Sequence, residues 1–162
     1  MNWEAIGAVA ESLGAIGIIV TLIYLSTQLR QTNKALASAT RNSWRDAVQV
    51  TNQINISSPE NADVWYRAIN LGETLEGKDF GIFQVQASAG LNAFENVYLE
   101  YLDGNIEESF WLSKARTVEY LLARPAGKAV WDIWAEAGIA DPRFEAFVSG
   151  EIIPRIESNK MG

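Results

Sequence analysis

The 162-residue sequence contains no cysteine and no histidine. The lack of cysteine excludes disulfides, thiol nucleophiles and thiolate metal sites. The lack of histidine removes the commonest metal ligand and the usual general base. Serine-nucleophile motifs and phosphate-binding glycine loops are missing as well. We therefore expect a protein that is not an enzyme, and we predict neither a metal site nor a cofactor.

Basic residues are also few, 13 against 20 acidic ones, and the net charge of -7 gives a nucleic-acid partner no electrostatic basis. Their distribution is uneven. Residues 12–45 contain no acid and four bases, whereas the remainder of the chain after Arg45 has 18 acids and 9 bases. The four bases are Arg30, Lys34, Arg41 and Arg45. They form a short basic segment between an apolar N-terminus and an acidic body.

The N-terminus contains the one long hydrophobic run of the chain. From Ala5 to Leu25 the only charged residue is Glu11. A helix of about 20 residues spans about 30 Å, the thickness of a bilayer core. Trp3 and Tyr24 stand where interfacial aromatic residues are expected. We predict a transmembrane helix over residues 1–31.

The basic residues Arg30 and Lys34 follow this run and predict that the C-terminal domain, residues 32–162, is cytoplasmic, with the N-terminus outside. A cleavable signal peptide fits less well, because residues 1–4 contain Glu4 and no basic residue. A buried central helix of a soluble domain stays open as an alternative.

Small residues recur in the predicted membrane helix at spacings of three and four. They are Gly7, Ala10, Gly14, Gly17 and Thr21. The opposite face carries Ile16, Ile19, Val20 and Ile23. Small residues let membrane helices approach each other closely, so this stripe predicts packing in a homo-oligomer or against another membrane protein.

Glu11 borders the small-residue stripe. A carboxylate in the membrane is costly and is usually paired or turned inward. Three interpretations stay open: a ring of acids around a cation path, a hydrogen bond to a partner helix, or a position near the outer headgroups.

The remainder of the chain has helical periodicity and no sustained alternation of polar and apolar residues. Ser58 and Pro59 form a helix-start signal that recurs at Asp141 and Pro142, and Pro125 starts another helix. A longer helix is expected from Gly77, with two apolar stripes. We predict an all-α fold, in which the N-terminal transmembrane helix is followed by a bundle of about five or six helices.

The expected long helix carries four polar residues in an apolar context, Asn92, Glu95, Asn96 and Tyr98. We predict a buried polar cluster there. A buried glutamate with asparagine neighbours serves in some proteins as a general base or as part of a carboxylate-only metal site, but more often it is a hydrogen-bonded anchor between helices. Four tryptophans are expected in the core or around an apolar ligand, namely Trp65, Trp111, Trp131 and Trp134.

Several of these segments resemble a group of small, membrane-anchored, α-helical bacterial proteins. The residues that carry the resemblance are Ile23-Tyr24-Leu25, Gln28-Leu29-Arg30-Gln31, Phe94-Glu95-Asn96, Trp111, Pro125-Ala126-Gly127, Trp131 and Pro142-Arg143-Phe144. The group has Tyr where Phe94 stands, and Pro125-Ala126-Gly127 corresponds to its Pro-Gly turn. The resemblance implies a bacterial inner-membrane protein with a helical cytoplasmic domain, and implies no activity.

These observations lead to one principal hypothesis and three alternatives. The principal one is a non-catalytic single-span protein that self-assembles, or joins a membrane complex, through the small-residue stripe. The alternatives are an oligomeric ion channel with a Glu11 ring, an accessory subunit of a larger membrane complex and, least favoured, a membrane-surface enzyme that uses Glu95.

Overall fold

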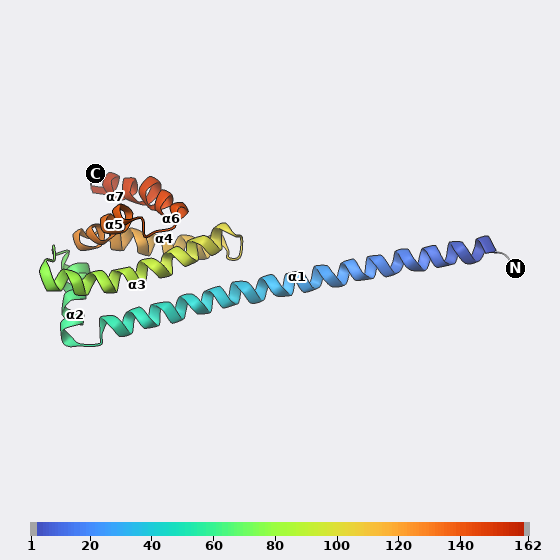
Figure 1. Cartoon of the computed structure of the whole chain (residues 1–162), viewed down its shortest axis with the longest axis horizontal. Helices are drawn as coiled ribbons and strands as arrows, with labels where there is room; N and C mark the ends of the chain where they lie inside the picture. Colours follow the sequence, from blue (N-terminus) through green and yellow to red (C-terminus); the bar gives the residue numbers. More distant parts are fainter. Residues whose placement is uncertain (1–2, 161–162) are drawn as a thin grey trace. The chain divides into compact units, whose positions relative to one another are not determined.

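The computed structural model describes residues 3–160, and within that range the chain is helical with no strand. Figure 1 shows the helices in chain order. Two short π-helical segments continue α2 and α6. The elements are α1 (Trp3–Asn55), α2 (Pro59–Tyr66), η1 (Arg67–Leu71), α3 (Gly77–Leu102), α4 (Glu108–Leu122), α5 (Pro125–Ala137), α6 (Pro142–Phe147), η2 (Val148–Ile152) and α7 (Ile153–Lys160). The predicted all-α fold, a long apolar helix followed by a helical bundle, is confirmed.

The chain divides into two compact units, which meet within α1 between Ala39 and Thr40. The first unit is the N-terminal part of α1. The second contains the last turns of α1 and all the other helices. The sequence divides the chain at residue 31, where the hydrophobic run ends, but α1 continues through Thr32 and Asn33 without interruption.

Local signals set the starts of two helices in the second unit. The Ser58 side chain accepts a hydrogen bond of 3.1 Å from the Asn61 amide at the start of α2, and Pro59 occupies the first helical position. Asp141 caps α6 in the same way, since its carboxylate accepts a hydrogen bond of 2.9 Å from the Arg143 amide. Serine and aspartate caps satisfy amides that have no partner inside the helix. Both predicted helix starts are confirmed.

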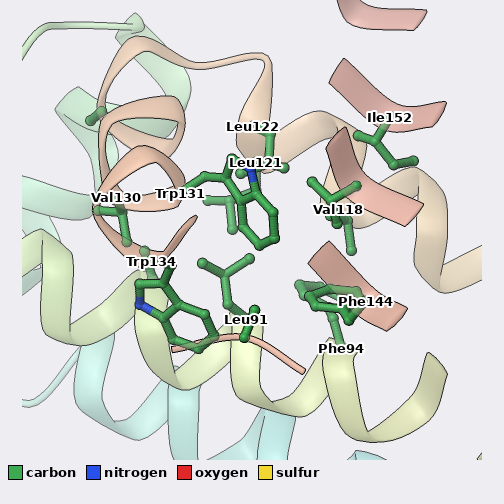
Figure 2. Close-up of a cluster of buried hydrophobic side chains, with 14 of the residues drawn as sticks. Leu91, Phe94, Val118, Leu121, Leu122, Val130, Trp131, Trp134, Phe144 and Ile152 are labelled. Atoms are coloured by element: carbon green, nitrogen blue, oxygen red, sulfur yellow. The ribbon is translucent and has the colours of Figure 1, made fainter. Parts of the chain in front are cut away.

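The core of the second unit lies around α3, which packs against α4, α5 and α6 (Figure 2). Leu91 and Phe94 come from α3, and the Trp131 ring of α5 meets the Phe144 ring edge-on at 5.9 Å between centroids. Trp134 is buried, and its indole N–H donates to the Ser88 hydroxyl over 3.1 Å. These contacts hold three helices against one face of α3.

The second apolar stripe expected on the long helix consists of Ile82, Val85, Ala89, Ala93 and Val97, and it is wrong at one position. Ala93 and Val97 of that stripe are buried, but Val85 is 63% exposed. Val85 lies two residues from the fully buried Phe83, which turns it to the opposite side of α3. The spacing of apolar residues predicts the apolar face of α3, but it does not show how far the neighbouring helices cover that face.

Candidate functional site

The N-terminal part of α1 is the first candidate for a functional site. The helix contains a segment that is long and apolar enough to cross a membrane, and none of that segment is buried. Every side chain from Leu13 to Leu36 is exposed. Large apolar side chains there, such as Ile16 and Leu22, are 58% and 60% exposed. This apolar segment therefore lacks the burial expected of the central helix of a soluble domain, the alternative that the sequence left open.

The small-residue stripe presents an open surface. A methyl group placed on Gly7, Gly14 or Gly17 has no atom within 4 Å. The Thr21 hydroxyl donates to the Gly17 carbonyl over 2.8 Å, so its polar group is satisfied within the helix. The side chain of Ala10 lies outside the residues that the structure describes. The described part of the stripe therefore has no side-chain polar group without a hydrogen bond.

Three charged residues near the apolar segment are exposed on α1. They are Glu11, Arg30 and Lys34. None forms an ion pair with another described residue of the chain. The placement that the sequence predicted for them, at or near membrane boundaries, stays a prediction.

The polar group predicted on the long helix is not one buried cluster. Asn92 and Asn96 are exposed, and the Asn92 amide donates to the Ser88 carbonyl within α3. Asn92 and Asn96 are four residues apart, so both lie on the side of α3 that faces solvent. Glu95 is half-buried, and its carboxylate accepts a hydrogen bond from the Asp141 amide, immediately before α6. Glu95 thus joins α3 to the start of α6, the arrangement of a structural anchor.

Tyr98 packs among aromatic rings rather than beside the other three polar residues. Its ring lies 5.0 Å from Trp111, 5.7 Å from Phe144 and 4.8 Å from Phe147, measured between centroids. Burial raises the pKa of the Tyr98 hydroxyl, and the Glu151 carboxylate raises this pKa further. The phenol therefore stays neutral at physiological pH. Its surroundings are those of a core aromatic residue.

The second candidate is a cavity of about 570 Å³ inside the second unit, between the last turns of α1 and helices α2, α3 and α4. Trp44 and Val48 of α1 line one wall, and Ala87 and Gly90 of α3 line the opposite one. Trp65, which the sequence assigned to the core or to a ligand pocket, is half-buried and lines this cavity. The other three tryptophans of that set are buried in the core.

Two polar side chains of the cavity lack protein partners of the usual kind. Lys114 is half-buried, and its Nζ lies 5.0 Å from the centroids of both the Trp44 and Phe110 rings. Asn55 is 6% exposed, and its Oδ1 accepts no hydrogen bond from a described residue. Buried polar groups are nearly always hydrogen-bonded, so this acceptor is unusual. Among the residues whose side chains the structure describes, no group of acidic side chains could hold a metal ion.

The sequence contains a partial signal for this cavity. Trp44, Val48 and Asn55 repeat at helical spacing and share one face of α1. Lys114 was not predictable, because it comes from α4 and meets Trp44 only in the folded chain. Local periodicity indicates a helix face but does not identify the residue opposite it.

Comparisons with known proteins do not assign either site. No protein-family model, curated protein or solved structure matches this chain. The resemblance carried by Ile23-Tyr24-Leu25 and Phe94-Glu95-Asn96 stays an interpretation of the sequence. The functional argument therefore depends on the residues of the apolar helix and of the cavity.

Proposed function

We propose that this chain is a non-catalytic, single-span membrane protein that associates with further copies of itself through the small-residue stripe of α1. The helical domain follows Arg30 and Lys34 in the sequence. It lies on the cytoplasmic side of a bacterial inner membrane. The stripe consists of Gly7, Ala10, Gly14, Gly17 and Thr21.

The observation that carries this proposal is the continuous apolar exposure of α1. Apolar side chains from Leu13 to Leu29 are exposed on all sides of the helix, and each large one is between 51% and 64% exposed. A soluble monomer rarely exposes a contiguous apolar surface of this length, because water disfavours it. A bilayer removes that penalty, and α1 is long enough to cross one.

The form of the stripe supports self-association. In lipid, helices gain little by hiding one aliphatic side chain from another, and they associate where small residues allow close backbone contact. The described glycines of the stripe have open space around them. The opposite face, with Ile16, Ile19 and Ile23, carries large side chains suited to lipid.

The absence of native cysteine allows a direct test with single-cysteine variants. We expect Gly17→Cys to form a disulfide-linked dimer in oxidised membranes, because Gly17 lies at the contact between copies. The matched control is Ile19→Cys, two residues away on the lipid-facing side, which we expect to stay monomeric. The measurement is the dimer fraction on non-reducing gels.

Sidedness is tested with Ser158→Cys, an exposed position in α7. We expect a membrane-impermeant maleimide to label it in broken cells and not in intact cells. Extraction of the chain by salt alone would contradict membrane insertion.

In the cross-linking experiment, equal dimer fractions at positions 17 and 19 would contradict the stripe as the contact between copies. A cross-link only to a different chain would instead support an accessory subunit.

A further inference from the structure

The cavity of the second unit has the size and lining of a small-ligand site. Its volume of about 570 Å³ falls within the roughly 300–1,000 Å³ that such sites occupy. Apolar side chains form most of its wall, including Trp44, Val48 and Leu121. This lining favours a ligand with a hydrophobic body.

The charge of the cavity favours an acidic ligand. Among the described residues that line it, the one charged side chain is Lys114. The aromatic rings of Trp44 and Phe110 attract the ammonium group without neutralising it, and no described carboxylate forms an ion pair with it. The chain has a net charge of -7, so the positive charge of this cavity is opposite in sign to that of the chain as a whole.

We propose that this cavity binds a single-chain anionic amphiphile, a long-chain fatty acid. The carboxylate pairs with Lys114, and the chain lies against Trp44 and Val48. Gly90 leaves room for the chain, since a methyl group there has only Phe94 Cε2 within 4 Å, at 3.9 Å. This binding does not depend on whether α1 crosses a membrane.

The test uses the quenching of tryptophan fluorescence in the full chain, held in lipid nanodiscs. Dibrominated stearic acid is the probe, because bromine quenches the indoles of Trp44 and Trp65 on contact. We expect saturable quenching. We also expect palmitic acid to displace the probe at about tenfold lower concentration than methyl palmitate, because the ester lacks the carboxylate charge that pairs with Lys114.

A matched pair of glycine variants separates the cavity from the bilayer. Gly90→Leu fills the cavity from α3, whereas Gly81→Leu places the same side chain on the same helix at an exposed position with nothing within 4 Å. We expect Gly90→Leu to abolish saturable quenching and Gly81→Leu to preserve it. Circular dichroism checks that both variants are folded.

A polar variant tests the carboxylate contact. Lys114→Gln should weaken the affinity for palmitic acid by about tenfold, since it removes a charge-assisted contact. The affinity for methyl palmitate should stay unchanged.

Other results overturn the proposal. Equal quenching in the two glycine variants would mean that the probe reaches the tryptophans from the bilayer alone. Displacement by methyl palmitate as strong as that by palmitic acid would exclude Lys114 as the carboxylate site. If the chain proves soluble, the same titration in buffer decides this proposal while the membrane proposal fails.

Discussion

Individual residues in this domain are constrained by contacts that composition does not reveal. Gly127 corresponds in sequence to a Pro-Gly turn, yet it lies inside α5 and is buried. A Cβ atom there would lie 2.1 Å from the Leu121 carbonyl oxygen and 2.9 Å from the Leu121 carbonyl carbon. The requirement for glycine therefore comes from the close approach of α5 to the end of α4, not from a turn.

This contact predicts the effect of a single methyl group. Gly127→Ala should lower the free energy of unfolding by about 3 kcal/mol, because the backbone of α4 must move to accommodate it. Gly90→Ala is the comparison within another helix. A Cβ atom there would lie 3.9 Å from the nearest atom. The free energy of unfolding should therefore rise by up to about 1 kcal/mol, because alanine has a higher helix propensity than glycine. Urea unfolding of both variants measures the difference, and equal stabilities would contradict the steric argument.

Residue-scale roles were only partly predictable. The interpretation of Glu95 as a structural anchor agrees with its contact to the Asp141 amide, but the sequence did not name that partner. Its predicted companions Asn92 and Asn96 face solvent. Composition indicates which residue types are unusual on a helix, whereas the packing of α4, α5 and α6 decides which side of α3 is covered.

At the scale of elements, the sequence predicted where helices start better than which helices pack against each other. The pairs Ser58-Pro59 and Asp141-Pro142 act through neighbouring amides, so local information was sufficient. The face of α1 that carries Trp44 and Asn55 was not distinguished, because the walls opposite it come from α2, α3 and α4. The cavity therefore required the folded structure.

The start of α6 predicts a pH dependence. Hydrogen bonds from the Arg143 side chain and amide lower the pKa of the Asp141 carboxyl. A carboxyl whose folded-state pKa is lowered stabilises the fold above its unfolded pKa, and this contribution disappears as the pH falls through the folded value. Between neutral pH and pH 5, the Asp141 contribution should be constant. Below about pH 4 it should decline.

The variant Asp141→Asn isolates this effect, because asparagine caps helices as well as aspartate does but does not titrate. We expect the melting temperature of the native chain to exceed that of the variant at neutral pH, and the gap to close on acidification. Differential scanning calorimetry over a pH series measures it. A gap that stays constant down to the lowest pH would show that the Asp141 charge does not contribute.

At the scale of the whole molecule, the two units have opposite surface character. The first exposes apolar side chains, while residues 40–162 contain 18 acidic and 11 basic residues, a net charge of -7. Among the residues whose side chains the structure describes, the buried core is drawn from Val64 to Ile156 and includes none from the first unit. The last turns of α1 contribute Trp44, which packs on Phe94 at 5.0 Å between centroids, and Arg41, which pairs with Glu107 at 3.2 Å.

This separation predicts that residues 40–162 fold alone. We expect the fragment to be a helical monomer without detergent, because it keeps the core, Trp44 and Arg41 and loses the exposed apolar segment. The full chain should require detergent or lipid. Light scattering after size exclusion gives the mass, and far-ultraviolet circular dichroism gives the helix content. Aggregation of the fragment would mean that the first unit contributes to its stability. A full chain that stays monomeric in buffer would instead remove the reason for placing α1 in a membrane.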